Sequence, residues 1–221
     1  MTGEKVAFQS YARSGNTFLR RYLEQVTGLF TGSDMPMKFT FFEGIMGLLG
    51  NNTVCDSNTV WVTKTHYPMS LPGATLPFTA NKMIVIARNP IDVIPSHAHL
   101  VNLSSHSLTI EGQWHEDYPE YWEKWASSTI HNLKVNHDNV VNTLSNEIPT
   151  YYMRYEDLKV SPQPVLEGLF CFLLNVDSIR GTIVEKRIKD ITATGFETKT
   201  AYKLKDTSLN LNRNAHMYSS E

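Results

Sequence analysis

The feature that most constrains this chain is an alternation of short, nearly continuous apolar runs with longer stretches of helical spacing. Apolar runs of this kind are typical of strands that are buried on both faces of a parallel sheet. Parallel strands need crossover connections, which the helical stretches supply. The sequence therefore predicts an α/β fold, a three-layer sandwich with a central parallel sheet. The expected strands are Lys5–Ser10, Thr59–Lys64, Lys82–Ala87 and Thr150–Arg154, and the expected helices are Thr17–Thr27, Ile91–Val101, Pro119–Leu144, Gln163–Leu174 and Ile179–Asp190.

The length of 221 residues suits a single domain that covers residues 1–221. Residues 28–58 and 103–117 are rich in Gly, Ser, Asn and Thr, so we expect loops there, with one short helix near Phe41–Leu49. The last stretch, Thr192–Glu221, is polar and irregular, which fits either a closing flap or a frayed tail.

Composition and charge exclude several classes of partner. A formal net charge of −2 gives no broad electropositive field, so nucleic acid is not an expected partner. We expect no signal peptide and no membrane span, because the first strand begins near Met1 and the apolar stretch Phe39–Leu49 is far shorter than about 20 residues. Cys55 and Cys171 have no metal-ligand spacing. We interpret both as free thiols of a cytoplasmic protein.

The stretch "SYARSGNTFLRRYLEQ", Ser10–Gln25, joins the first strand to the first helix through a turn that carries a cation, two hydroxyls, a glycine and an amide. A turn that feeds a helix N-terminus offers N–H donors and a positive dipole end, which suit a phosphate. The nucleotide-triphosphatase pattern Gly-x-x-x-x-Gly-Lys-[Ser/Thr] is absent, because Asn16 follows Gly15 and the cation, Arg13, precedes it. Taken alone, the turn fits a capped helix start equally well.

Two more expected strands also end in cations. Thr59–Lys64 leads into Lys64-Thr65-His66, and Lys82–Ala87 leads into Arg88, with Ser96 eight residues further along the next helix. Because the carboxyl ends of parallel strands meet at one edge of the sheet, three strands would each deliver a cation to the same crevice.

This combination resembles the sulfotransferase family that uses 3′-phosphoadenosine 5′-phosphosulfate (PAPS), most closely its cytosolic type, and the resemblance implies that family's fold, which is similar to that of P-loop nucleotide triphosphatases. The resemblance covers the chain from Lys5 to about Pro162. It implies that His66 is the catalytic base and that Lys64 contacts the transferring sulfuryl group. It also implies these PAPS contacts: Arg13, Ser14, Gly15, Asn16 and Thr17 at the 5′-phosphosulfate, Phe18 and Tyr155 at the adenine, and Arg88 and Ser96 at the 3′-phosphate.

The chain departs from the family pattern in places. Arg13 stands where cytosolic members usually carry lysine, and Ala12 where proline is common. The family's C-terminal Arg-Lys-Gly signature is not evident. Three residues could replace this 3′-phosphate contact, and the sequence does not choose among them: Lys203, Lys205 and Arg213.

The chemistry of the residues agrees with these roles. Sulfuryl transfer needs an in-line nucleophile and donors that neutralise the non-bridging and leaving oxygens, which Arg13 and Lys64 supply without a metal. An imidazole with an ordinary pKa near 6.5 suits His66 as base toward a hydroxyl or amine of a small-molecule acceptor. Two alternatives stay open: a nucleotide-dependent phosphotransferase, and a non-catalytic sensor that binds PAPS or its product, 3′-phosphoadenosine 5′-phosphate (PAP). No carboxylate is evident at a strand end to hold magnesium, and a sensor needs no base.

Aromatic and acidic residues elsewhere have less specific interpretations. Four aromatic residues at helical spacing predict a buried helix face: Tyr118, Tyr121, Trp122 and Trp125. Trp114 and His115 precede that helix and could line an acceptor pocket for a phenol, a steroid or a flat amine. We interpret Glu156 and Asp157 as a solvated turn or a helix cap. The oligomeric state and the identity of the acceptor are left open by the sequence.

Overall fold

The computed structural model of the protein describes residues 4–34, 60–67, 79–103, 110, 113–195 and 214–218. Several sequence-based expectations fall outside these residues: the short helix near Phe41–Leu49, the thiol of Cys55, and the cations Lys203, Lys205 and Arg213. Cys171 lies within them and is a free thiol.

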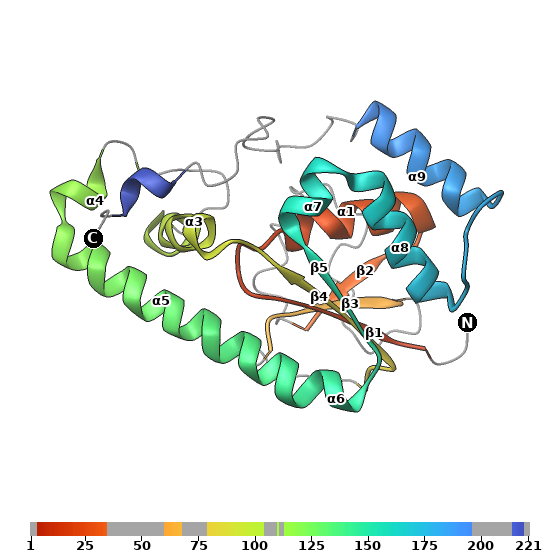
Figure 1. Ribbon diagram of the computed structural model, residues 1–221, viewed down its shortest axis with the longest axis horizontal. Coiled ribbons are helices and arrows are strands. Elements are labelled where there is room, and N and C mark those ends of the chain that lie inside the picture. The colour runs from red at the N-terminus through yellow and green to blue at the C-terminus, as the bar shows by residue number, and fades with distance from the viewer. Residues whose placement is uncertain are drawn as a thin grey trace.

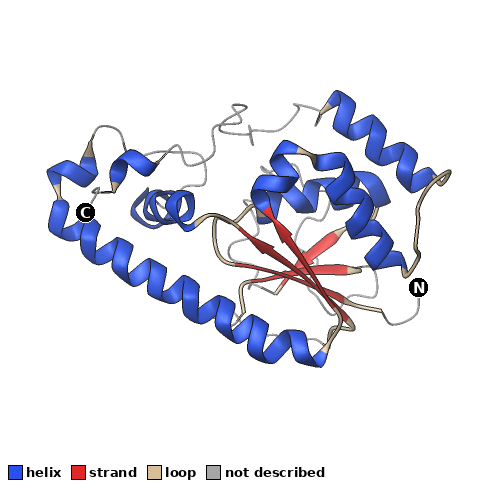
Figure 2. Ribbon diagram, in the orientation of Figure 1, coloured by secondary structure: helices blue, strands red, loops and turns tan. Residues whose placement is uncertain are grey.

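A five-stranded, all-parallel sheet forms the centre of the described structure (Figure 2). The strand order is β2-β3-β1-β4-β5, so the first strand lies in the middle. The α/β fold with a central parallel sheet is therefore confirmed. The strands are β1 (Val6–Ser10), β2 (Thr31–Ser33), β3 (Val62–Thr65), β4 (Lys82–Ala87) and β5 (Thr150–Arg154).

Helices lie on both faces of this sheet, with α1, α7, α8 and α9 on one side and the long α5 on the other (Figure 1). The α-helices are α1 (Asn16–Thr27), α3 (Pro90–Leu103), α4 (Trp114–Asp117), α5 (Pro119–Asn139), α6 (Ser145–Glu147), α7 (Tyr155–Val160), α8 (Pro162–Leu174) and α9 (Ile183–Thr194). A π-helical segment, η2 (Val140–Leu144), follows α5, and a 3₁₀ turn, η3 (Ala215–Met217), lies near the C-terminus.

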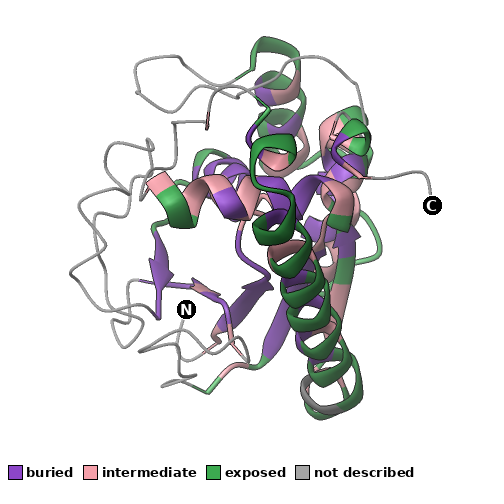
Figure 3. Cartoon of the chain, turned by 90° about the vertical axis from the view of Figure 1, so that its left-hand side faces the viewer, coloured by how far each residue is buried: buried purple, intermediate pink, exposed green. Residues whose placement is uncertain are grey.

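Successive residues of the central strands alternate between two apolar cores. In β4, Ile84 and Ile86 join the core under α1, α8 and α9, whereas Met83 and Val85 pack on the opposite face with Val140. This alternation follows from the period of two in a strand, and both faces are apolar because both are covered. Figure 3 shows most strand residues as buried, apart from the edge strand β5, and the outer side of the long helix as exposed.

The edge strand β2 was not predicted, because its sequence Thr-Gly-Ser has no apolar run. Side chains of α1 hold it in place. The buried guanidinium of Arg20 donates to the Thr31 hydroxyl (2.7 Å) and carbonyl (3.2 Å), and the Thr31 N–H donates to the Glu24 carboxylate (2.9 Å). A polar network that is satisfied inside the protein can therefore replace the hydrophobic signal of a strand.

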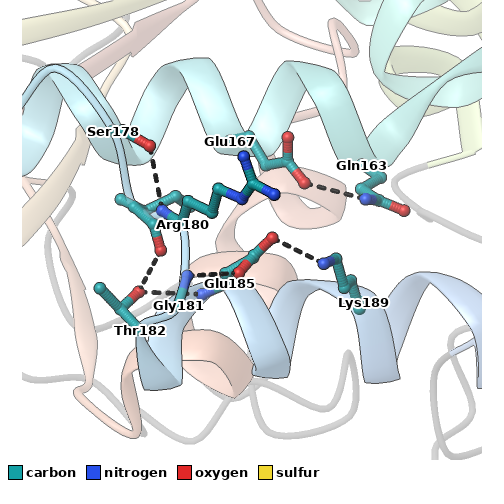
Figure 4. A network of polar contacts seen from close by, with 9 residues as sticks. Gln163, Glu167, Ser178, Arg180, Gly181, Thr182, Glu185 and Lys189 are labelled. Carbon is teal, nitrogen blue, oxygen red and sulfur yellow. Dashed lines mark hydrogen bonds and ion pairs between the residues drawn. The ribbon is translucent and has the colours of Figure 1, made fainter.

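The helix α9 begins four residues later than the predicted start at Ile179. Thr182 caps it by accepting from the N–H of Glu185 (3.3 Å), and the Glu185 carboxylate accepts from the N–H of Gly181 (2.7 Å) and from Lys189 (2.6 Å) (Figure 4). This is a capping arrangement of the Thr-x-x-Glu type, which sets the start of a helix more sharply than apolar spacing does.

The C-terminal turn η3 docks on α3 and completes its hydrogen bonding. Pro95 lies inside α3 and has no N–H, so it cannot bond the carbonyl of Ile91 one turn earlier. The Tyr218 hydroxyl donates to that carbonyl (3.0 Å), and Asn214 donates to the Asp92 carboxylate (2.9 Å). Residues 214–218 are therefore attached to the fold and do not form a frayed end.

The predicted buried aromatic face is only partly correct. Trp122 is buried, but Tyr118 is 66% exposed and Tyr121 is 43% exposed. Tyr118 is the residue before α5 and has a non-helical backbone (φ −132°, ψ 63°), so helical spacing does not place it on the helix face. Trp114 lies in the short helix α4 and not in a loop, and its ring packs edge-on against Trp122 at 5.3 Å.

Candidate active site

The loop between β1 and α1 has the backbone of an anion-binding turn. Gly15 precedes α1 with a φ of 94° and has no side chain to cap the helix. Arg13 has a φ of 70°, a left-handed conformation that costs a non-glycine residue about 1–2 kcal/mol. Ser14 is fully buried, and its hydroxyl has no hydrogen-bond partner among the described residues. A buried, unsatisfied donor at a helix N-terminus fits a bound phosphate or sulfate.

Arg13, Ser96 and Arg88, three of the residues singled out in the sequence, lie in contact with one another. The Nε of Arg13 donates to the Ser96 hydroxyl (2.9 Å), and Nη1 of Arg88 donates to the Arg13 carbonyl (2.8 Å). The second contact stabilises the left-handed backbone of Arg13. In this turn the Arg13 carbonyl lies outside the hydrogen bonding of strand and helix, and Arg88 supplies its donor. The Nε of Arg88 is buried and has no partner among the described residues, so one donor of this cation remains for a ligand.

Tyr155 joins this group from the start of α7. The guanidinium of Arg88 lies 4.7 Å from the centre of the Tyr155 ring, a cation–π contact, and Phe18 packs edge-on against the same ring at 5.9 Å. A Cβ added to Gly15 would lie 2.4 Å from Cδ2 of Tyr155. Gly15 is therefore required twice, by its backbone angle and by the close approach of this ring.

His66 is held in one tautomer by the main chain of β1. Its Nδ1 lies 2.6 Å from the carbonyl oxygen of Ser10, which can only accept, so Nδ1 carries the proton. The lone pair is then on Nε2, which is the form a proton acceptor needs. The Ser10 hydroxyl accepts from the Asn16 amide (3.1 Å), and this bond ties β1 to the first turn of α1.

Burial keeps His66 neutral. The side chain is 7% exposed, and desolvation followed by the nearby charge of Lys64 lowers the pKa of His66 to about 3, against the bond to Ser10, which raises it. His97, on α3 beside Ser96, behaves in the same way: burial and then the charge of Arg13 lower its pKa to about 4. The ordinary imidazole pKa expected for His66 is therefore wrong for this structure, because it holds for exposed side chains.

Two buried carboxylates near these loops were not recognised in the sequence. Glu156 is not part of a solvated turn: it is 5% exposed and accepts from the N–H of Asn89 (2.8 Å), which joins α7 to the loop after β4. Asp34 is 8% exposed and follows β2, and its N–H donates to the carbonyl of Lys64 (3.0 Å). A carboxylate therefore does lie at the end of a strand, contrary to the expectation from the sequence.

Neither acid had a sequence signal that pointed to the site. Asp34 follows a strand that has no apolar run, and Glu156 resembles an ordinary acid in the first turn of a helix.

Within the described residues there is no group of three or more His, Cys, Asp or Glu side chains that could hold a metal ion. No helix in that part of the chain is long and apolar enough to cross a membrane.

Comparison with known proteins identifies the family. The sulfotransferase domain family matches residues 4–207 of the chain, which is most of its length. The chain belongs to the sulfotransferase family. The structural neighbours below are sulfotransferases with a P-loop-like fold, which confirms the fold that the family resemblance implied.

Curated proteins, two of them named as sulfotransferases, are similar to this chain at low identity. Sulfotransferase 1B1 of Mus musculus is 26% identical over 179 residues, which cover 76% of this chain and 58% of the relative. Sulfotransferase 1A1 of Rattus norvegicus is 25% identical and covers 88% and 70%, and the WSCD family member CG9164 of Drosophila melanogaster is 26% identical and covers 81% and 54%. The chain thus spans between 54% and 70% of the length of these curated relatives.

Solved sulfotransferase structures share the fold. The sulfotransferase domain from the curacin biosynthetic pathway has a TM-score of 0.53 at 19% identity and covers 98% of this chain and 83% of its own. Retinol dehydratase in complex with androsterone and the inactive cofactor PAP has a TM-score of 0.51 at 17% identity and covers 86% and 63%. Mouse sulfotransferase SULT7A1 complexed with PAP has a TM-score of 0.50 at 18% identity, with the same coverage.

Proposed function

We propose that this sulfotransferase moves a sulfuryl group from PAPS to a hydroxyl, or an amine, of a small-molecule acceptor, with His66 as the general base. The observation that carries the proposal is the fixed tautomer of His66, whose Nδ1–H is 2.6 Å from the Ser10 carbonyl, next to the cation of Lys64. Two structural neighbours were solved with PAP, which supports PAPS as the donor.

The residues of the loop after β1 fit the 5′ end of PAPS. Ser14 has a buried hydroxyl without a partner among the described residues, Gly15 gives the turn its positive φ and lets Tyr155 approach, and Arg13 contributes a positive charge. PAPS would supply the sulfuryl group and a leaving phosphate. The N–H groups of the loop and the cations Arg13 and Lys64 would bind and orient these oxygens, and they would stabilise the charge that moves toward the leaving group.

On the other side of Arg13, the residues fit the nucleoside and its 3′-phosphate. Arg88 has a buried Nε without a partner among the described residues, and the Ser96 hydroxyl lies within 2.9 Å of Arg13. Tyr155 and Phe18 supply the aromatic surface next to them. Phe18 is only 5% exposed, so in this arrangement Tyr155 offers more ring surface to the adenine than Phe18 does.

His66 would take the proton of the acceptor. Because the pKa of His66 is about 3, its imidazole is neutral at any pH well above that value. As the reaction proceeds, the negative charge that develops on the acceptor oxygen would raise the basicity of the His66 imidazole. His66→Ala should lower kcat by about 10²- to 10⁴-fold on a hydroxyl acceptor and leave PAP affinity within threefold. A variant within threefold of the wild type in a transfer assay with labelled PAPS would contradict the role of His66.

The phosphotransferase alternative is tested by thermal unfolding with ligands. The carboxylate of Asp34 removes one reason against magnesium, but no lysine follows Gly15 and the cation there precedes the glycine. PAP without metal, at about a hundred times its Kd, should raise the Tm by roughly 5–10 °C, because it adds about 2.7 kcal/mol of stability. If ATP with magnesium stabilises the protein and PAP does not, a phosphotransferase is the better assignment. If PAP binds but no acceptor in a broad screen is sulfated, the protein is a sensor.

A further inference from the structure

Asp34 is a buried acid that the proposed reaction does not yet use. It is 8% exposed, and neither carboxylate oxygen has a hydrogen-bond partner among the described residues. Burial raises its pKa above the usual value, whereas the Thr65 hydroxyl, which lies close to the carboxylate but outside hydrogen-bond geometry, and then the Lys64 charge lower it in part. Burying a polar group without a hydrogen-bond partner costs free energy, so we expect these two oxygens to accept hydrogen bonds from a ligand in the functional state of the protein.

The strand that carries Asp34 is fixed, so the acid is held in place. Arg20 and Glu24 of α1 bond both polar groups of the Thr31 main chain, three residues before Asp34. The N–H of Asp34 donates to the Lys64 carbonyl at 3.0 Å and continues the pairing of β2 with β3. A preorganised, unsatisfied carboxylate is a feature of binding sites more than of structural acids, which normally have their partners within the fold.

The strand order of the sheet indicates whether Asp34 lies on the nucleotide side or on the acceptor side of the site. This step rests on the proposed function. The nucleotide-binding residues follow β1, β4 and β5, whereas His66 follows β3 and Asp34 follows β2, the edge strand beyond it. In an in-line transfer the acceptor attacks from the side opposite the leaving nucleotide. The acceptor therefore approaches over β3 and β2, next to Asp34.

We propose that Asp34 accepts a hydrogen bond from a second hydroxyl of the acceptor, beside the one that reacts, so that the enzyme prefers acceptors with vicinal hydroxyls, such as sugars and other polyols. An ionised carboxylate only accepts hydrogen bonds, and its two oxygens can serve neighbouring donors. A neutral donor fits better than an ammonium group, because the charge of Lys64 already acts on Asp34.

The test compares pairs of acceptors that differ by one hydroxyl, on the wild type and on variants that each change one Asp to Asn. The probes are methyl glucoside with its 2-deoxy analogue and catechol with phenol, each measured as kcat/KM with labelled PAPS and as binding to the enzyme–PAP complex. Wild type should prefer each diol by roughly 10- to 150-fold, the usual effect of one hydrogen bond to a charged group. Asp34→Asn should remove that preference by weakening the diol alone. Asp157→Asn, at an exposed acid of α7, is the control and should change neither acceptor.

Folding of each variant is checked by the PAP-dependent rise in Tm, which should equal that of the wild type. Equal loss on diol and single-hydroxyl acceptors would overturn the proposal, as would a wild type without preference for the diol. Stabilisation by magnesium chloride that disappears in Asp34→Asn would also overturn it and would assign the acid to a metal. A wild type that sulfates both acceptors equally leaves the sulfotransferase activity intact, whereas a wild type that neither binds PAP nor transfers sulfate refutes the activity and this inference together.

Discussion

The depressed pKa of His66 makes the stability of the protein depend on pH in a specific way. In the unfolded chain the imidazole has a pKa of 6.5, and in the fold about 3. Between these values the unfolded state binds a proton that the folded state does not, so stability is complete above pH 6.5 and falls as the pH falls. From pH 7.5 to pH 5.0 the interval below 6.5 is 1.5 units, and at about 1.36 kcal/mol per unit His66 should cost about 2 kcal/mol.

His97 acts with the same sign, since its pKa is lowered to about 4 and its unfolded value is also 6.5. The two histidines together should cost the wild type about 4 kcal/mol at pH 5.0 relative to pH 7.5. The matched variant is His66→Gln, which does not titrate and keeps an N–H donor for the Ser10 carbonyl. All other ionisable groups are common to both proteins and cancel in the comparison.

The assay is urea unfolding followed by circular dichroism at pH 7.5, 6.5, 5.5 and 5.0, with constant ionic strength. The variant should lose about 2 kcal/mol less than the wild type over this range. A difference below about 0.5 kcal/mol would refute the reasoning, because His66 would then have to be solvated or charged in the folded protein. His97→Gln should give a second reduction of similar size, because burial lowers the pKa of His97 to about 4.

Three further perturbations follow from single contacts. Gly15→Ala should reduce stability and PAP affinity much more than Gly28→Ala, because both glycines have positive φ but only the first would clash, with the ring of Tyr155; unfolding and PAP titration of both variants measure the difference. Arg88→Ala should weaken PAP by roughly 10- to 150-fold and AMP, which lacks the 3′-phosphate, by less than a tenth as much; equal weakening would mean that Arg88 acts only through the loop after β1. Tyr218→Phe should cost about 1–3 kcal/mol in urea unfolding, because a carbonyl of α3 loses its donor, and an unchanged midpoint would contradict this contact.

The sequence predicted the part of the fold that hydrophobic periodicity encodes. The strands β1, β4 and β5 and the helix α1 were found within one residue of their ends, because each combines an apolar run with clear boundaries. The strand β2 was missed, since its stability comes from the side chains of Arg20 and Glu24 and not from its own composition. The start of α9 was misplaced, since a cap at Thr182 overrides the apolar spacing before it.

Some features of the candidate site could likewise be predicted from the sequence, and others could not. The position of the cations and His66 at the carboxyl ends of strands could be predicted, because each follows an apolar run in the sequence, and their roles remain predictions from the family resemblance. Their detailed state could not be predicted, because it depends on burial: the neutral His66, the buried Glu156 and an Asp34 without a partner in the described part of the chain all result from how separate elements pack together. Main-chain groups such as the Ser10 carbonyl are equally hidden, since every residue has one and only the fold decides where it points.

The helix α1 has a consequence for how substrates are discriminated. Its first turn forms the loop that would hold the sulfuryl donor, and its buried Arg20 and Glu24 fix the strand that ends in Asp34. A rigid shift of this one element would therefore move the loop after β1 and the position of Asp34 together. Substitutions at Arg20 should accordingly change the Michaelis constants of both substrates at once, even though Arg20 itself is buried away from solvent.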